Sequence, residues 1–583
     1  MLTGKEYLSV FLLFFWLVFA DSLAKSVDNM EGNEAASENV IRQSRSLCAG
    51  EQEYVVRRKL VVLESLNSLG ISCTEDAVPH IALLASGGGQ RAAVALIGFL
   101  YQMEKEGLLD TLLYLGGVSG STWSMSSLYS DPDWSTNMDK AVSRLTGPAV
   151  GLEEALAWLS EKSKKEYFSL SDVWGVLTST AVMRQIDLRH FSDEARRNST
   201  NPYPIYSAIE KHCFSNGPTE GKWFEVSPHE AGFPEIGLFV KTSHLGSRFQ
   251  SGELLEQKPE MDMVELQGVL GCALAHGDMI KQFIPPWLNV PEYTDSAAEE
   301  YLRVYNALVK LVDLTRNLIK QPTAVSDLDK LEKILQDMVN CNKSELLESK
   351  DPDGRKGLFQ QWSLDLLGAV ETWSETLEDG TFTTHGQFFL LVKRVLPLII
   401  NWEWGTTSNF LYQYPDPSVP PCLTSKDRFH LIDAGIMINV AYPSFLGDKR
   451  DIDLIIAPEY SAGNMFETLT LARDYAVSMK KPFPEIDNKI LEERDWPKNC
   501  YVFEGKAKEP TIVYLPLFNR QNCKDEEEFK AKMEEYSTFQ RPFSQEKIDF
   551  VLETAKANMK NNNETLLREI NRAIHRRQNK LQG

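Results

Sequence analysis

Short apolar runs that end in glycine-rich turns, each followed by a helical pattern, recur along the chain. Residues 79–85 form one such run and lead directly into the triple glycine of residues 87–89, and a helical pattern follows over residues 92–106. A second run at residues 112–115 ends in a Gly-Gly-Val-Ser-Gly turn before another helical segment. Two consecutive strand–turn–helix units predict a parallel sheet with crossover helices. Active sites in such sheets form beyond the carboxyl ends of the strands, so the two glycine turns are expected to face each other there.

The same alternation weakens between about residues 130 and 430 and then returns. An apolar strand at residues 429–432 ends in an Asp-Ala-Gly turn, and a further buried strand is predicted within residues 450–457. The other predicted elements are helices at residues 51–69, 298–321, 326–340, 464–479 and from 545 onward, strands at 223–229 and 236–240, and a loop at 341–357. Most of the aromatic and apolar residues between positions 362 and 404 are expected to form ordinary core, and the alternative for some of them is an acyl-chain channel or a bilayer interface, which spacing does not separate from core.

Composition argues mainly against certain partners and ligands. The 583 residues carry a formal net charge of −21, which argues against nucleic acid as the main partner but does not exclude a membrane surface. The eight cysteines are scattered, with no closely spaced pair and no cluster at zinc spacing. We therefore expect mostly free, buried thiols, no metal site and no cofactor.

The N-terminus has a different character from the rest of the chain. An apolar run at residues 8–20 follows Lys5 and precedes Ser22-Leu23-Ala24, which predicts a secretory signal peptide over residues 1–24. The alternative is a hydrophobic segment that dips into a membrane, because the run is short for a transmembrane helix. Residues 25–47 are polar and acidic and are predicted to form a disordered linker. A catalytic domain is then expected over residues 48–583, with a cap or lid insertion within about residues 180–400.

Ser119 is the candidate nucleophile. It lies between glycines in the second turn, where a sharp strand-to-helix bend would hold its hydroxyl above the sheet. The backbone N–H groups of Gly87, Gly88 and Gly89 are candidate donors to a developing oxyanion. The alternatives are a glycine–serine turn without chemistry and a phosphate-binding loop, although the triple glycine lacks the Gly-Lys-Ser/Thr ending of a P-loop.

A nucleophilic serine needs a base within hydrogen-bond reach. The histidines outside predicted helices, His229, His244, His385 and His430, do not lie in a turn after a core strand. Asp433 does, and a buried carboxylate whose pKa is raised toward neutrality can act as the base directly. This favours a Ser119–Asp433 dyad over a triad, with a turn aspartate that bonds its own backbone as the alternative.

Together these segments resemble the cytosolic (group IV) phospholipase A2 family, and most closely its gamma branch, which has no C2 domain. The resemblance extends from about residue 45 to the C-terminus. The motifs that carry it are Ser86-Gly87-Gly88-Gly89-Gln90-Arg91, Gly117-Val118-Ser119-Gly120-Ser121-Thr122-Trp123, residues 223–228, residues 402–407, Asp433-Ala434-Gly435 and Ser461-Ala462-Gly463.

The resemblance implies a patatin-like α/β catalytic domain with a central, mostly parallel sheet flanked by helices. By this resemblance Ser119 is the acyl-enzyme nucleophile, Asp433 its base, Gly87, Gly88 and Gly89 the oxyanion hole, and Arg91 the group that binds the substrate phosphate. The implied reaction is hydrolysis of the sn-2 ester of glycerophospholipids to a free fatty acid and a lysophospholipid. The alternatives are lysophospholipase or transacylase activity on the same dyad, or a non-catalytic lipid-binding relative.

The resemblance also implies partners and a compartment. We expect a phospholipid membrane surface as the partner, no nucleic acid and no obligate protein partner. Without a C2 domain, activity is expected to be independent of calcium. The family implies a cytoplasmic protein that associates peripherally with membranes, whereas residues 1–24 favour the secretory pathway.

Overall fold

The computed structural model describes residues 40–148, 150–275, 403–538 and 542–582, together with residues 333, 336 and 398. The predicted signal peptide, the helices at 298–321 and 326–340, the loop at 341–357 and nearly all of the aromatic stretch lie outside the described residues. The chain divides into two compact units, and helix α6 (Leu152–Lys162) belongs to one of them. The second unit comprises residues 35–150, 171–275 and 404–583 and contains every candidate site residue.

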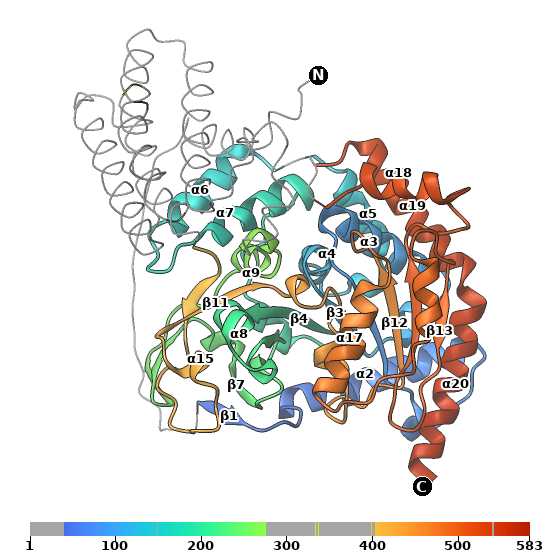
Figure 1. The fold of residues 1–583 in the computed structure, drawn as a ribbon, viewed down its shortest axis with the longest axis horizontal. Helices are drawn as coiled ribbons and strands as arrows, with labels where there is room; N and C mark the ends of the chain where they lie inside the picture. Colours follow the sequence, from blue (N-terminus) through green and yellow to red (C-terminus); the bar gives the residue numbers. More distant parts are fainter. Residues whose placement is uncertain are drawn as a thin grey trace. The chain divides into compact units, whose positions relative to one another are not determined.

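A mixed sheet of twelve strands forms the centre of the second unit (Figure 1). Its main path runs β1-β7-β6-β5-β4-β3-β2-β12-β14-β13, while β10 pairs with β11, and β11 pairs with β4. The strands are β1 (Ile41–Gln43), β2 (Ile81–Ala85), β3 (Tyr114–Gly117), β4 (Tyr203–Glu210), β5 (Trp223–Val226), β6 (Glu230–Phe233), β7 (Leu238–Lys241), β10 (Thr406–Ser408), β11 (Arg428–Asp433), β12 (Leu454–Glu459), β13 (Tyr501–Phe503) and β14 (Thr511–Pro516). A separate hairpin joins β8 (Arg248–Gln250) and β9 (Glu253–Glu256).

The central strands β4, β3, β2, β12 and β14 run parallel to one another, as the repeated strand–turn–helix pattern predicts. Every residue of β2, β12 and β14 is buried, which explains why these strands appear as continuous apolar runs and not as alternating ones. Antiparallel strands extend the sheet beyond β4 and beyond β14. The α/β fold class expected from the sequence is therefore confirmed.

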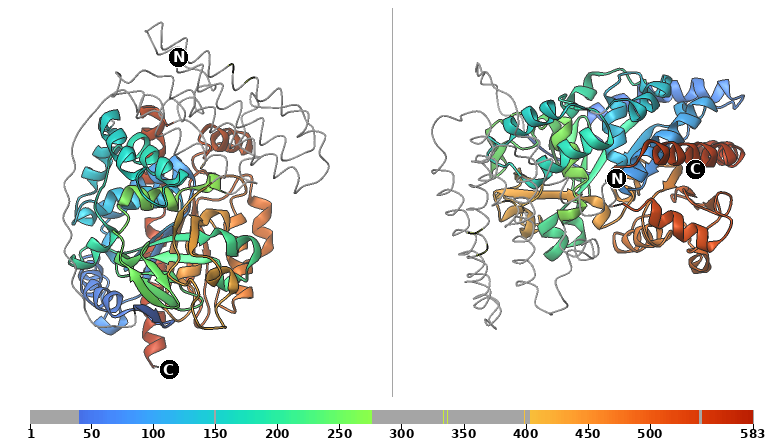
Figure 2. Two further views of the ribbon diagram at one scale, coloured as in Figure 1. Left: turned by 90° about the vertical axis from the view of Figure 1, so that its left-hand side faces the viewer. Right: turned by 90° about the horizontal axis from the view of Figure 1, so that it is seen from above.

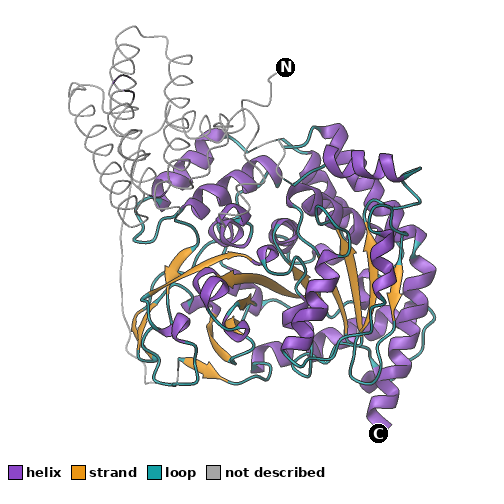
Figure 3. Ribbon diagram, in the orientation of Figure 1, coloured by secondary structure: helices purple, strands orange, loops and turns teal. Residues whose placement is uncertain are grey.

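Helices surround the strands of this unit (Figure 3). Helix α19 packs along α3, and α20 contacts β12 and β14. Figure 2 marks the C-terminus, at which α20 ends. The other helices of this unit are α2 (Ala49–Ser68), α3 (Gly89–Lys105), α4 (Gly120–Tyr129), α5 (Met138–Thr146), α7 (Leu170–Leu177, whose first residue falls in the other unit), α8 (Lys211–Asn216), α9 (Met263–Leu270), α15 (Pro421–Thr424), α16 (Tyr442–Phe445), α17 (Glu467–Ser478), α18 (Glu526–Glu535), α19 (Gln545–Asn561) and α20 (Asn563–Gln582). Within the described ranges, no helix combines the length and the apolar character that crossing a bilayer requires.

Two predicted boundaries need correction. The linker prediction over residues 25–47 is wrong for residues 41–43, because they form β1 and pair with β7 at the edge of the sheet. Residues 203–241, which lie inside the range given for a cap, form β4 to β7 of the central sheet. Their hydrophobic pattern is interrupted by short turns, which hides their continuity with the parallel strands.

Candidate active site

The turn after β3 has the conformation that its small residues predict. Ser119 adopts φ 55° and ψ −126°, a strained backbone for a residue with a side chain, and α4 begins at the next position. The serine is 7% exposed. Glycines on both sides are required sterically, because a Cβ at Gly117 would lie 2.4 Å from the sulfur of Met125. The predicted sharp turn at Ser119 is confirmed.

The triple-glycine turn meets the serine turn directly. A Cβ at Gly120 would lie 2.1 Å from the carbonyl oxygen of Gly89, and a Cβ at Gly87 would lie 2.7 Å from the Cβ of Ser119. These distances are far below van der Waals contact, so only glycine lets the two backbones approach this closely. The prediction that the two turns face each other at one edge of the sheet is confirmed.

Strand β11 brings Asp433 to the same edge, but from the opposite direction. It runs antiparallel to β4 and overlaps it with only its last three residues, with Asp433 opposite Ala208. Ala208 and Ile209 already pair with β5 on their other side, so β11 must lie on the edge of β4 that β3 also uses. Strands β3 and β11 therefore meet tip to tip along β4.

Asp433 lies at the expected edge of the sheet, but the direction of its strand differs from the expected one. The strand–turn–helix pattern predicts parallel strands whose carboxyl ends share an edge, but β11 runs antiparallel to β4. Gly117 pairs with Tyr206 of β4, so the register brings Ser119, two residues later, to the level of Ala208, where Asp433 pairs. The two residues meet because both strands end there, with their carboxyl ends facing each other along β4.

Asp433 is completely buried. Its Oδ1 accepts a hydrogen bond of 2.8 Å from the N–H of Gly435, while Oδ2 has no partner among the described residues. Burial raises the pKa of Asp433 to about 6, and the hydroxyl of Ser119 and the N–H of Gly435 offset part of that rise. A carboxylate with this pKa is ionised at neutral pH and has one oxygen ready to accept a proton.

The glycine turn offers fewer free donors than the sequence suggested. The N–H of Gly87 donates to the carbonyl of Asn439 at 2.9 Å, so it does not serve an oxyanion in this structure. The prediction that Gly87 is a donor is therefore wrong, because a backbone contact that no sequence pattern reveals already uses its hydrogen. Gly88 caps α3 and Gly89 is its first residue, so their N–H groups lie at a helix N-terminus, where no carbonyl of the helix can reach them.

Asn439 is a site residue that the sequence reasoning missed. Besides its carbonyl bond to Gly87, its side-chain N–H donates to Ser461 Oγ at 2.6 Å. Its Oδ1 lies 2.2 Å from the Cβ position of Gly87 and 2.5 Å from that of Gly435. Asn439 thus joins the glycine turn to the loop after Asp433. Its only signal in the sequence is its place shortly after Asp433.

Arg91 lies beside the glycine turn but is engaged by the protein. Its side chain is 1% exposed, and Nε and Nη2 donate to the carbonyl of Tyr460 at 2.8 and 2.6 Å. Nη1 donates to the carbonyl of Tyr536. Burial lowers the pKa of Arg91 to about 10, and the nearby Glu459 carboxylate partly offsets this effect. Arg91 therefore anchors two distant backbone segments next to Gly88. A Cβ placed on Gly88 would lie only 3.3 Å from Nη2 of Arg91.

The remaining candidates do not assemble at this edge. The ring of His229 hydrogen-bonds to the Tyr203 hydroxyl, and no hydrogen bond among the described residues joins a histidine ring to Ser119 or Asp433. His385 lies outside the described residues. No group of three or more potential metal ligands is found in the parts of the chain that the structure describes.

Most of the described cysteines are free, as expected, although only two of the free thiols are buried, and one pair is bonded. Cys213 and Cys422 form a disulfide although 209 positions separate them. Nothing in the local spacing of either residue could have indicated this pair, because the fold alone brings α8 and α15 together. The free thiols of the described residues are Cys48, Cys73, Cys272, Cys500 and Cys523.

Comparisons with known proteins identify relatives of this chain. A family model described as a lysophospholipase catalytic domain matches residues 81–285. Cytosolic phospholipase A2 gamma from Homo sapiens is 31% identical over 541 residues, which cover 89% of this chain and 94% of that protein. The Mus musculus protein of the same name is 30% identical over 545 residues, 89% of this chain and 90% of that protein. Among solved structures, human GIVD cytosolic phospholipase A2 shares the fold, with a TM-score of 0.64, 21% identity, and coverage of 93% of this chain and 69% of that one.

Proposed function

We propose that this chain, which belongs to the cytosolic phospholipase A2 family and is a serine ester hydrolase, hydrolyses the sn-2 ester of glycerophospholipids. The proposed catalytic groups are a Ser119–Asp433 dyad. The observation that carries the proposal is the buried Asp433, whose unpartnered Oδ2 lies at the level of the strained Ser119 turn. A serine and a carboxylate placed in this way can perform acyl transfer without a histidine.

In the proposed first step, Oδ2 of Asp433 accepts the hydroxyl proton of Ser119 while Oγ attacks the ester carbonyl. The N–H groups of Gly88 and Gly89 stabilise the resulting oxyanion. The carboxyl group then returns the proton to the leaving lysophospholipid oxygen, which leaves an acyl ester on Ser119. Water, deprotonated by the same carboxylate, attacks this ester, the bond to Oγ breaks to release the fatty acid, and the carboxyl group returns the proton to Ser119 Oγ.

Arg91 is proposed to bind the phosphate of the substrate in addition to its structural bonds. A guanidinium has five N–H groups, and the bonds to Tyr460 and Tyr536 use one each on Nε, Nη1 and Nη2. One N–H on each terminal nitrogen remains. Because the group stays cationic and adjoins Gly88, it can contact a phosphate without leaving its carbonyl partners.

The experiment is hydrolysis of phosphatidylcholine vesicles that carry label in the sn-2 chain. Wild type is expected to release labelled fatty acid, whereas Ser119→Ala and Asp433→Asn should not exceed the background. Ser68→Ala and Asp76→Asn change exposed residues of the same types far from the site and serve as matched controls. Equal release by all five proteins would refute the dyad.

The alternative activities are separated by their products. Release of an sn-1 label, or hydrolysis of lysophosphatidylcholine at a higher rate, would favour a lysophospholipase, and transfer of label to an acceptor lysolipid would favour a transacylase. The match to a lysophospholipase catalytic domain is the reason to test these activities. Activity is proposed to be independent of calcium, so loss on chelation and recovery on calcium addition would contradict that proposal.

For the compartment, we propose a cytoplasmic protein that acts at membrane surfaces, following the name of its relatives. The alternative is the secretory pathway, which residues 1–24 and the Cys213–Cys422 disulfide favour, since disulfides persist in oxidising compartments. N-terminal sequencing of the mature protein decides between them, because secretion would remove the first 24 residues.

A further inference from the structure

The strand that carries Asp433 has little support from the sheet on the side of the dyad. Only Leu431, Ile432 and Asp433 of β11 pair with β4, and the other half of β11 pairs with β10 alone. The tip-to-tip arrangement with β3 prevents a longer overlap, because β3 uses the remaining edge of β4. The position of Asp433 relative to Ser119 therefore depends on what holds β11 against β4 elsewhere.

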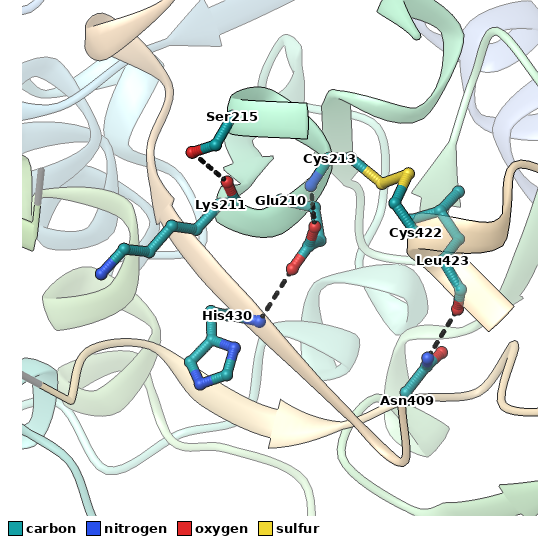
Figure 4. The surroundings of a disulfide bond; sticks show 8 residues. All are labelled: Glu210, Lys211, Cys213, Ser215, Asn409, Cys422, Leu423 and His430. Atoms are coloured by element: carbon teal, nitrogen blue, oxygen red, sulfur yellow. Dashed lines mark hydrogen bonds between the residues drawn. A yellow bond between two sulfur atoms is a disulfide. The ribbon is translucent and has the colours of Figure 1, made fainter. Parts of the chain in front are cut away.

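Besides its packing against α8 and α9, two bonding contacts tie β11 and the helix before it to the end of β4 and to α8 (Figure 4). The carboxylate of Glu210, the last residue of β4, accepts hydrogen bonds from the N–H of Cys213 at 2.6 Å and the N–H of His430 at 3.2 Å. The disulfide then joins Cys213 of α8, the helix after β4, to Cys422 of α15, the helix before β11. The side chain of Asn409 donates to the carbonyls of Leu423 and Lys426 and fixes the link from α15 to β11.

We propose that the Cys213–Cys422 disulfide is a positioning element for the catalytic base, so that its reduction lowers the rate of hydrolysis. The inference rests on the proposed role of Asp433. The bond closes a loop between the two flanks of β11 and β4. Without it β11 keeps three residue pairs and one carboxylate bridge on β4, together with its packing against α8 and α9. Small displacements of a base cost large factors in rate, because proton transfer requires close approach to the nucleophile.

The two halves of the bond differ in exposure, and we expect a reductant to attack at the more exposed residue. Cys213 is fully buried, whereas Cys422 is partly exposed on α15. A thiolate of dithiothreitol attacks the Cys422 sulfur, the S–S bond breaks, and Cys213 leaves as a thiolate that takes up a proton. The second thiol of the reagent then displaces Cys422, so that two electrons pass to the protein and dithiothreitol becomes its cyclic disulfide. Reoxidation in air or by glutathione disulfide restores the bond.

The test uses the full-length protein and sn-2-labelled phosphatidylcholine vesicles. Mass spectrometry after iodoacetamide labelling reports whether Cys213 and Cys422 are oxidised, and kcat and KM are measured before reduction, after reduction and after reoxidation. We expect kcat to fall by roughly tenfold on reduction, KM to change by less than about twofold, and both to recover on reoxidation. The Cys213→Ser/Cys422→Ser double variant should behave like the reduced wild type and should not respond to dithiothreitol.

The pH profile separates positioning from general destabilisation. The acidic limb of kcat/KM should move to lower pH on reduction, since a displaced Asp433 gains access to water and loses the burial that raises its pKa. Cys73→Ser removes one of the free thiols and should keep the full response of the wild type. An unreduced wild type that does not hydrolyse the substrate would refute the proposed function. An active wild type whose kcat and pH profile are unchanged by reduction, or whose Cys213 and Cys422 are both free thiols, would overturn the disulfide proposal alone.

Discussion

Replacing Asp433 by asparagine should stabilise the folded protein at high pH while it removes the base. Asp433 is fully buried, and its pKa rises from 3.8 to about 6 in the folded state. The folded state thus binds this proton more tightly than the unfolded chain does. Stability is therefore lost as the pH rises from the unfolded pKa toward the folded pKa, and the loss is complete above about pH 6.

The magnitude follows from the two pKa values. At about 1.4 kcal/mol for each pKa unit, a rise from 3.8 to about 6 corresponds to about 3 kcal/mol of lost stability at pH 8. At pH 5 the loss is only partly developed and amounts to about 1.5 kcal/mol. Asparagine has no charge to bury, and its Oδ1 can still accept the hydrogen bond from Gly435. The free energy of unfolding of Asp433→Asn, relative to that of wild type, should therefore rise by about 1.5 kcal/mol between pH 5 and pH 8.

Guanidinium unfolding of wild type and Asp433→Asn at both pH values measures this difference. Asp76→Asn, which changes an exposed aspartate, is the matched control and should show no such growth with pH. A difference that is equal at pH 5 and pH 8 would refute the conclusion that Asp433 is ionised at a cost in the folded protein. The same variant should be inactive in the vesicle assay.

Three further outcomes are expected. The kcat/KM of wild type should rise through about pH 6 with a slope of one as Asp433 ionises, and a profile that is flat from pH 5 to pH 8 would exclude this carboxylate as the base. Gly120→Ala should lose activity and stability together, because its Cβ would lie 2.1 Å from the Gly89 carbonyl oxygen; normal activity and an unchanged unfolding midpoint would show that the two turns can separate freely. Glu51 and Arg450 form a fully buried ion pair of 2.8 Å, and Glu225 is the second carboxylate on Arg450; Glu51→Gln should cost about 3–5 kcal/mol of stability because it removes one of these two charges, and an unfolding free energy within about 1 kcal/mol of wild type would contradict a stabilising role for the pair.

The sequence predicted those parts of the site that local chemistry determines. The turn at Ser119 needs small neighbours, so its glycines were visible in the sequence, and so was the triple glycine that approaches it. The direction of β11 was not, because an apolar run reads the same whether a strand is parallel or antiparallel. The use of the Gly87 N–H by Asn439 and the pairing of Cys213 with Cys422 depend on contacts across more than 200 positions, and no local pattern records them.

The shared edge of β4 also sets an order of events during synthesis. The nucleophile leaves the ribosome 314 positions before the base (433 − 119), which at about 5–20 residues per second means a delay of roughly 15–60 s. During that time β3 can already lie on β4, while residues 208–210 of β4 lack the strand that will cover their second edge. An exposed strand edge invites pairing with a wrong partner. The nascent chain is therefore expected to be most prone to aggregation, and catalytically silent, until residues 428–433 emerge.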